Sequence, residues 1–134
     1  MSALDIEIGG KHYIKYRYQP IQLITMLDLD FPQGNIVKYV SRYDDKNGKE
    51  DLKKAVHYTQ YMDELSQREP MDYFDKRLEQ IEIFVKENNM NPVIYNIIYG
   101  VCMMDSFVIL TGIKKLYLDT YKEELDLDVK LNCL

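Results

Sequence analysis

The stretch FPQGNIVKYVSRYDDKNGKEDLKKAVHY, Phe31 to Tyr58, carries two helical patterns separated by a polar turn. In its first part, apolar side chains follow the i, i+1, i+4, i+7 spacing of one helical face, at Ile36, Val37, Val40 and Tyr43. Asn47-Gly48 favours the backbone angles that end a helix or shape a tight loop. The helical pattern resumes near Lys49 and runs to about Arg68, with Leu52, Ala55, Val56, Thr59 and Met62 facing inward. The stretch therefore predicts a helical hairpin.

On its N-terminal side, the hairpin is preceded by a short helix and an arm. Pro20 suits the first turn of a helix near 20–28, whose apolar face would hold Ile21, Ile24 and Leu27. Pro32 disfavours helical angles at Phe31, so we expect the next helix to begin after this pair. Residues 4–18 alternate between apolar and polar side chains, which indicates either two short strands or an extended arm.

On its C-terminal side, the hairpin is followed by three further helical patterns. Pro70 ends the hairpin, and residues 71–88 predict an amphipathic helix with Phe74, Leu78, Ile81, Ile83 and Val85 on its apolar face. From Pro92 onward we expect two buried helices, interrupted at Gly100 and near Asp105 and Gly112. The last residues, from 126, are read as a short strand, a frayed tail or an interaction peptide.

These patterns predict a mainly α fold, a small helical bundle with an extended or short β N-terminal arm. The chain of 134 residues is long enough for one core, so we expect a single domain over 1–134. Within it, residues 1–68 would form the hairpin with its arm, and residues 70–134 an acidic helical extension. Residues 1–60 carry 9 Lys and Arg against 8 Asp and Glu, whereas residues 61–134 carry 8 against 14.

Charge, hydropathy and cysteine usage exclude several classes of protein. An acidic chain lacks the broad basic surface of a general nucleic-acid-binding protein, although a local cluster suffices for a small phosphorylated ligand. No run approaches the roughly 20 apolar residues of a membrane span, and no signal peptide is evident, so we expect a cytoplasmic protein. Cys102 and Cys133 have no metal-ligand spacing, and with two histidines they do not predict a zinc site.

A candidate anion site lies on the first helix of the hairpin. Asn35, Lys38 and Arg42 are three and four residues apart, which places them on one helical face. A lysine supplies a point charge and an arginine a two-pronged donor, a combination that suits phosphate or carboxylate. Gly34 would let a ligand approach the backbone near the helix N-terminus. A solvated helix face is the alternative interpretation of the same spacing.

Residues outside this helix are also considered as parts of the site. Lys53 and His57 share a face of the second helix, beside Lys54, and His12 and Tyr13 lie in an arm that is able to fold over the basic face. Gly48-Lys49-Glu50 is not a P-loop, because the pattern requires a glycine five residues earlier and a hydroxyl after the lysine. The acidic candidates for magnesium are Asp28, Asp30, Glu50 and Asp51, for which capping and ion pairing are the preferred interpretation.

The order of these motifs resembles a known family. KHY at 11–13, YQPIQLI at 18–24, LDFPQGNIVKYVSRY at 29–43 and GKEDLKKAVHY at 48–58 are similar to the small phage-encoded nucleotide kinase-like family (domain of unknown function 3310), over about residues 10–65. The resemblance implies a site at the positions of His12, Tyr13, Gly34, Asn35, Lys38, Tyr39, Arg42, Asp51 and Lys53. Tyr43-Asp44-Asp45-Lys46 stands where the family has a basic turn, which weighs against phosphoryl transfer more than against binding.

Three hypotheses about function follow. The first is a phage accessory protein in the infected bacterial cell that binds nucleotides at Lys38 and Arg42. It would phosphorylate deoxynucleoside monophosphates, with magnesium, if it is a kinase. The second is a non-catalytic sponge for a nucleotide signal of antiphage defence. The third is a protein-interaction module acting on a host protein. The tyrosine-rich composition, 12 in all, also suggests a homo-oligomer.

Overall fold

The protein is built from helices. The computed structural model describes residues 2–8, 13–45 and 47–127. Within these ranges no strand occurs, which confirms the mainly α class and the small helical bundle. The described residues of the arm form no strand and contain a single 3-10 turn, η1 (Ala3–Asp5). The remaining helices are α1 (Pro20–Met26), α2 (Phe31–Ser41), α3 (Gly48–Leu65), η2 (Lys76–Leu78), α4 (Glu79–Glu87), α5 (Val93–Cys102) and α6 (Ser106–Tyr121).

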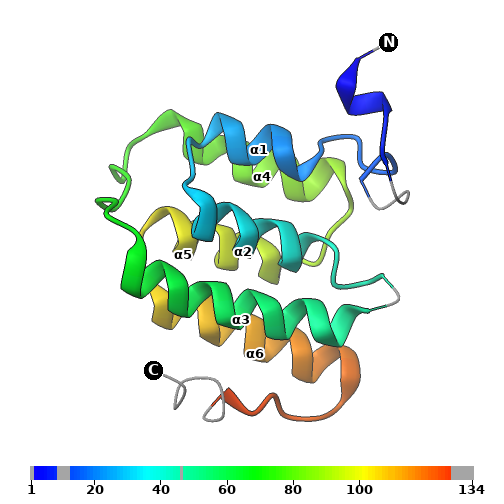
Figure 1. Cartoon of the computed structure of the whole chain (residues 1–134), viewed down its shortest axis with the longest axis vertical. Coiled ribbons are helices and arrows are strands. Elements are labelled where there is room, and N and C mark those ends of the chain that lie inside the picture. Colours follow the sequence, from blue (N-terminus) through cyan, green and yellow to red (C-terminus); the bar gives the residue numbers. More distant parts are fainter. Residues whose placement is uncertain (1, 9–12, 46, 128–134) are drawn as a thin grey trace.

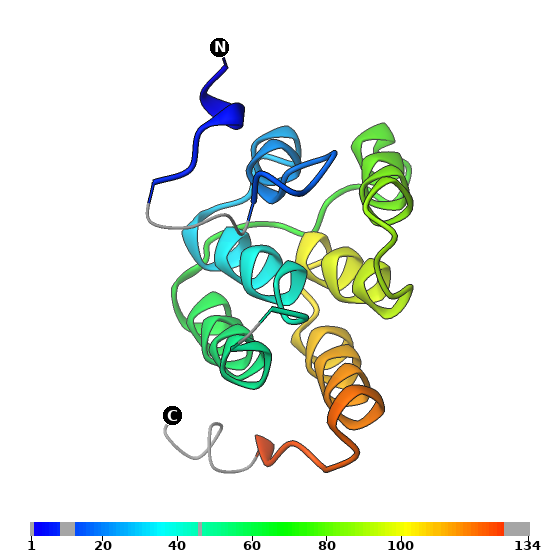
Figure 2. The ribbon, with the colours of Figure 1, turned by 90° about the vertical axis from the view of Figure 1, so that its right-hand side faces the viewer.

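The six α-helices form two layers of three. α1, α2 and α3 lie side by side in one layer, and α4, α5 and α6 lie behind them in the other (Figure 1). Each helix of the first layer packs on its counterpart in the second, α1 on α4, α2 on α5 and α3 on α6. The view along the layers shows both edge-on, with the arm beside α1 (Figure 2). The hairpin of α2 and α3 thus presents one face to the core and the other to solvent.

The core lies between the two layers and confirms the inward face predicted for the hairpin. Ile36, Val37 and Val40 of α2 are fully buried, and Tyr43 beyond it is half-buried. All five residues expected to face inward from α3 are buried: Leu52, Ala55, Val56, Thr59 and Met62. Isoleucines from the second layer complete the core: Ile81, Ile94, Ile97, Ile98, Ile109 and Ile113.

The start of α2 corrects one prediction. The helix begins at Phe31, ahead of Pro32, rather than after this pair. Asp30 is the N-cap: its side chain accepts a hydrogen bond from the Gln33 backbone N–H at 3.0 Å, and the Gln33 side chain accepts one from the Asp30 N–H at 3.0 Å. A proline in the first turn costs the helix no hydrogen bond, because the first N–H groups have no intrahelical acceptor. The capping box therefore outweighs the preference of the residue before proline.

Three helices differ from the prediction, either at an end or at single positions of the apolar face. On α1, Ile21 is 60% exposed and the buried positions are Leu23 and Leu27. The helix predicted over 71–88 begins only at η2 and α4, because Asp75 caps it by accepting from the Arg77 N–H at 2.9 Å. Phe74 therefore lies before the helix and is 87% exposed, and Ile83 is also exposed. The hairpin's second helix ends at Leu65 rather than Arg68.

Gly100 and Gly112 do not interrupt helices, contrary to the prediction; the break between α5 and α6 lies at residues 103–105 alone. There Asp105 caps α6 by accepting from the Val108 N–H at 3.1 Å. A Cβ atom on Gly112 would lie 2.5 Å from Cγ1 of Ile97, so this glycine lets α6 approach α5 closely. No helix among the described residues has the length and apolar character needed to cross a bilayer.

Candidate functional site

Three cationic side chains surround the ring of Tyr39. Lys38 and Tyr39 lie near the end of α2, Arg42 follows its last residue, and Lys54 comes from α3. The Nζ atoms of Lys38 and Lys54 lie 5.1 and 5.4 Å from the centroid of the Tyr39 ring, and Cζ of Arg42 lies 6.0 Å from it. We call these residues the cation cluster. The hairpin brings together charges that are up to sixteen positions apart in the sequence.

Arg42 is the member of the cluster with fixed partners. Its Nε donates to Oδ2 of Asp51 at 3.2 Å, and its Nη1 donates to the Tyr13 hydroxyl at 3.1 Å. Asp51 is 1% exposed, and its second oxygen, Oδ1, is buried without a hydrogen-bond partner among the described residues. Burial raises the pKa of Asp51, which the Arg42 charge opposes, and burial also raises the pKa of the Tyr13 hydroxyl. Arg42 thus joins the arm, α2 and α3.

Lys38 and Lys54 differ from Arg42 because they have no carboxylate partner. Among the residues that the structure describes, neither lysine has an acidic oxygen within ion-pair distance. Both ammonium groups lie beside the Tyr39 ring, and the Lys54 charge also acts to lower the pKa of the buried Asp51 carboxyl. Lys54 is exposed and Lys38 is half-buried, so both ammonium groups are accessible from one side of the hairpin. Two such charges beside one ring are an arrangement that a phosphate group would stabilise.

An apolar cavity adjoins the cluster under the arm. Its volume is about 380 Å³, and its wall includes Lys38 and Tyr13 together with apolar side chains of η1 and α1, among them Leu4, Pro20 and Ile24. The Tyr13 N–H donates to the Glu7 carboxylate at 2.5 Å, which folds the arm back on itself. Tyr13 therefore stands between this cavity and Arg42.

A contiguous group of aromatic rings continues from Tyr39 along the outer face of the hairpin. Tyr58 stacks on Tyr39 with ring centroids 5.8 Å apart, and Phe31 meets Tyr58 edge-on at 6.1 Å. Tyr61 lies 5.4 Å from Tyr58, and His57 stacks on Tyr61 at 4.5 Å. We call Phe31, His57, Tyr58 and Tyr61 the ring cluster. Phe31 is 73% exposed, and His57 and Tyr61 are exposed as well.

The other sequence-predicted residues have different surroundings. Asn35 lies on the same stripe of α2 as Lys38, and its side-chain amide donates to the Phe31 carbonyl at 2.8 Å. Gly34 is buried, and a Cβ atom there would lie 3.0 Å from Cγ2 of Ile24, so α1 packs directly on it. Lys53 lines a groove with Tyr117 and Glu123 and is not part of the cation cluster. His12 lies outside the described residues.

Two participants escaped sequence reasoning. The sequence favours a solvated position for Lys54; the residue is exposed, and it also contributes one of the three charges around Tyr39. Its position three residues after Asp51, which pairs with Arg42, is the signal that would have found it. Phe31 is the second, because the predicted helix start after Pro32 leaves it outside the helix, whereas α2 begins at Phe31 and its side chain is 73% exposed.

Three of the four acidic residues considered for magnesium have the capping and pairing roles preferred for them, and the fourth, Glu50, lies in the first turn of α3. Asp30 caps α2, Asp28 accepts a hydrogen bond from Arg68 at 3.4 Å, and Asp51 pairs with Arg42. Within the described residues, His, Cys, Asp and Glu side chains form no group of three that could hold a metal ion. Cys102 is buried, and burial raises the pKa of its thiol to about 12, which keeps the thiol protonated at neutral pH.

The turn between α2 and α3 is close-packed and has a structural role. Gly48 is buried, and a Cβ atom there would lie 1.7 Å from the Tyr43 carbonyl oxygen and 2.3 Å from the Tyr121 hydroxyl. That hydroxyl donates to the Tyr43 carbonyl at 3.2 Å, which ties the turn to the end of α6. Lys49 pairs with Glu123 at 2.5 Å just beyond. The turn therefore positions Arg42 and Asp51 and leaves no room for a ligand at Gly48.

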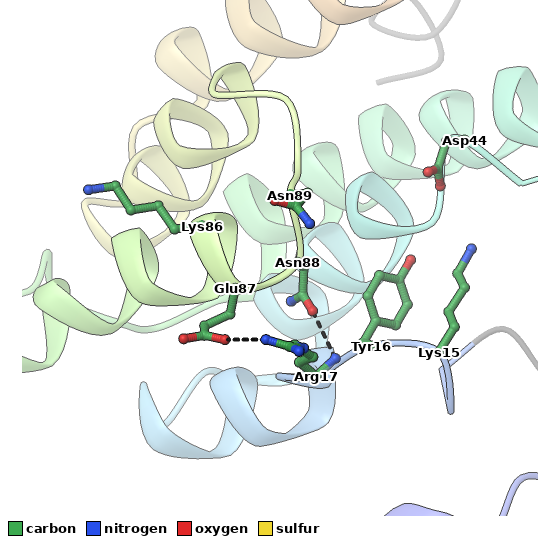
Figure 3. A pocket seen from close by; sticks show the side chains of 8 residues that line it. All are labelled: Lys15, Tyr16, Arg17, Asp44, Lys86, Glu87, Asn88 and Asn89. Carbon is green, nitrogen blue, oxygen red and sulfur yellow. Dashed lines mark hydrogen bonds and ion pairs between the residues drawn. The ribbon is translucent and has the colours of Figure 1, made fainter.

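A second groove, of about 480 Å³, lies between the arm and the end of α4 (Figure 3). Asn88 anchors the arm there: its Oδ1 accepts from the N–H groups of Arg17 and Tyr18 at 3.0 and 3.3 Å. Its Nδ2 donates to the carbonyls of Tyr18 and Phe84 at 2.7 and 3.0 Å. Asn88 therefore uses both ends of its amide to hold the arm to α4.

The cations of this second groove are paired, in contrast to those of the cation cluster. Lys15 lies 2.5 Å from Asp45, and Lys86 lies 2.7 Å from Glu82. Arg17 faces Glu87 at 3.8 Å, and the two side chains point toward each other in the close view (Figure 3). A groove whose charges are already balanced attracts an anion weakly. The cation cluster is consequently the better candidate site.

Comparison with known proteins supports the family match expected from the sequence, and the family description names no activity. Residues 9–60 match the family DUF3310, which is described as a protein of unknown function. The match runs from the arm through α2 into α3 and so includes the cation cluster and most of the ring cluster. It covers less than half of the 134-residue chain, and residues 61–134 lie outside it. No curated protein and no solved structure matches the chain significantly.

Proposed function

We propose that this protein binds nucleotides and holds their phosphate groups at the cation cluster. The observation that carries the proposal is the convergence of Lys38, Arg42 and Lys54 on Tyr39, with Asp51 as the one carboxylate that pairs with them among the described residues. Like charges close together repel one another, and a phosphate group removes that repulsion while accepting several charge-assisted hydrogen bonds. The nucleotide kinase-like character that the sequence resemblance implies favours a nucleotide over other phosphorylated molecules.

Binding ranks ahead of phosphoryl transfer in this proposal. Transfer requires a group that accepts or positions the attacking hydroxyl, and Asp51 is the acidic side chain nearest to the cluster. Asp51 is buried and hydrogen-bonded to Arg42, so it does not face a ligand from the solvent side. Two outcomes are therefore compared: sequestration of an intact nucleotide, and transfer of a phosphoryl group to a deoxynucleoside monophosphate. They differ in one measurable respect, which is whether the released ligand is chemically changed.

The test of binding is calorimetric titration of the full chain with ATP and, separately, with dTMP. We expect Lys38→Ala and Lys54→Ala each to weaken binding about tenfold or more, because a hydrogen bond to a charged group contributes about 1.5–3 kcal/mol. Lys76→Ala is the matched control, since Lys76 is an exposed lysine of η2 on the other layer. Equal affinities for the wild type and both cluster variants would remove the site from the proposal.

The second measurement separates the two fates of the ligand. The wild-type protein is incubated with ATP, dTMP and magnesium, and the nucleotides are then recovered and separated by chromatography. Formation of dTDP that Lys38→Ala abolishes identifies a kinase. Recovery of unchanged nucleotides, together with tight binding in the titration, identifies sequestration.

A further inference from the structure

The ring cluster adjoins the cation cluster. Together the two clusters suit a nucleotide as ligand better than they suit a phosphate ion, because they offer rings for a base as well as charges for a phosphate. Tyr58 stacks directly on Tyr39, the ring around which the three cations gather. The outermost ring, Phe31, is 73% exposed although it is one of only four phenylalanines in the chain. Exposed aromatic rings beside unpaired cations are the two components of surfaces that bind nucleic-acid bases and phosphates.

The order of side chains along α2 follows the order of groups in a nucleotide. Phe31, Asn35, Lys38 and Arg42 form one stripe, at the i, i+4, i+7 and i+11 positions. The ring comes first, the amide lies between, and the cations follow. Asn35 uses its Nδ2 on the Phe31 carbonyl, and its Oδ1 accepts no hydrogen bond from a described residue. An acceptor at this place suits a sugar hydroxyl between a stacked base and its phosphate.

We infer that the ring cluster is a base-stacking surface, on which the nucleobase lies against Phe31 and Tyr58 while Asn35 faces the sugar and Lys38 and Lys54 hold the phosphate. This inference rests on the proposed function, because it places the base of the same nucleotide. Stacking is tolerant of base identity, since every base has a π face. The site therefore takes both purine and pyrimidine nucleotides, and discriminates against phosphorylated sugars that lack a base.

The experiment compares ligands with and without a base. AMP, dTMP and ribose 5-phosphate are titrated against the full-length wild type by calorimetry. We expect both nucleotides to bind about tenfold more tightly than ribose 5-phosphate, the fold-change typical of one stacked base. We also expect the near-ultraviolet absorbance of the bound base to decrease, which is the signature of stacking.

Variants assign this difference to the rings. Phe31→Leu and Tyr61→Leu keep apolar side chains at exposed positions and should fold normally. We expect Phe31→Leu to reduce nucleotide affinity to near that of ribose 5-phosphate, to leave ribose 5-phosphate binding unchanged and to abolish the absorbance change. Tyr61→Leu should have a smaller effect in the same direction. Phe107→Leu is the matched control, because Phe107 is a 77% exposed phenylalanine of α6 in the other layer.

The outcomes for this inference and for the proposed function are distinguishable. Equal affinities for ribose 5-phosphate and the nucleotides, or unchanged nucleotide binding by Phe31→Leu, would overturn base stacking while leaving phosphate binding in place. If neither these three ligands nor ATP binds, the proposed function fails and the inference fails with it. Concentration-dependent self-association that Phe31→Leu abolishes would identify a second copy of the chain as the occupant of the rings and would also overturn the inference.

Discussion

Arg42 and Asp51 form an ion pair at the joint of the hairpin, with Arg42 Nε donating to Asp51 Oδ2 at 3.2 Å. Arg42 follows the last residue of α2, and Asp51 lies in the first turn of α3, so one contact links the two helices across their turn. Asp51 is buried and retains one unpaired oxygen. Arg42 therefore has two roles: it neutralises a buried carboxylate and adds its charge to the cation cluster.

We expect Arg42→Ala to lower the free energy of unfolding by about 3 kcal/mol at neutral pH, because it leaves a buried carboxylate without its partner. Burial raises the pKa of Asp51 and Arg42 opposes the rise, so the pKa should be higher still in the variant. A carboxyl group with a higher pKa in the folded state binds its proton more tightly when folded, and stability then increases as the pH falls through that pKa. Urea unfolding over a pH series should show part of the loss recovered in acid.

The control for this pH dependence is the double variant Arg42→Ala/Asp51→Asn. Asparagine does not titrate, so the double variant should lack the recovery in acid. A recovery of equal size in both variants would assign the pH dependence to other groups.

Gly48→Ala is expected to destabilise the protein by about 3 kcal/mol, the upper part of the range for overpacking, or to prevent folding. The added Cβ would lie 1.7 Å from the Tyr43 carbonyl oxygen, which is backbone and cannot move aside independently. Asn47→Ala, at the exposed neighbouring position without a side-chain capping bond, should change the free energy of unfolding by less than about 0.5 kcal/mol. Thermal and urea unfolding of the two variants test the contrast.

Sequence reasoning succeeded where a single helix carries its own pattern. The five inward residues of α3 follow a helical period without interruption, and all five are buried. It failed at helix ends, which capping side chains decide. Asp30 starts α2 ahead of Pro32, and Asp75 delays α4 so that Phe74 remains outside it. These caps are local, and the capping box of Asp30 and Gln33 could have been found in the sequence.

The candidate site was predicted in part for the same reason. Lys38 and Arg42 share one face of α2, and a helical spacing of four residues is enough to find them. Lys54 and Tyr58 join them only because α3 packs antiparallel to α2, and the register of that packing is set by Gly48 and the Tyr43–Tyr121 contact. Gly112 shows the same limit of sequence-based prediction in the core. Nothing in the sequence around it indicates that Ile97 lies against it.

Gly112→Ala should lower the free energy of unfolding by about 1–3 kcal/mol, because the new Cβ would lie 2.5 Å from Ile97 Cγ1. Ile97→Ala alone should cost about 2–5 kcal/mol by leaving a cavity. In the double variant the new methyl group occupies part of that cavity, so we expect a loss smaller than the sum of the two single losses. A double-mutant cycle measured by urea unfolding gives this coupling; strict additivity would contradict the close approach of α5 and α6.

Asn88→Ala should release the arm from α4, since it removes the acceptor of the Arg17 and Tyr18 N–H groups. We expect hydrogen exchange at these two amides to accelerate more than in the core of α5, together with a loss of about 1–3 kcal/mol in the free energy of unfolding. Asn96→Ala, at an exposed position of α5, is the control and should change neither quantity. Equal protection of the Arg17 and Tyr18 amides in both variants would mean that other contacts hold the arm.

The charges of the cation cluster lead to a prediction about thermal stability that does not depend on which nucleotide binds. Lys38 and Lys54 lack carboxylate partners among the described residues and lie beside Arg42, so their charges should oppose folding slightly in the absence of an anion. Lys38→Gln and Lys54→Gln should therefore unfold at the same temperature as the wild type or a few degrees above it in phosphate-free buffer. Added pyrophosphate should raise the melting temperature of the wild type and of Lys76→Gln, but much less that of the cluster variants, because a ligand stabilises only the state that binds it. Equal stabilisation of all four proteins would show that the anion binds elsewhere on the surface.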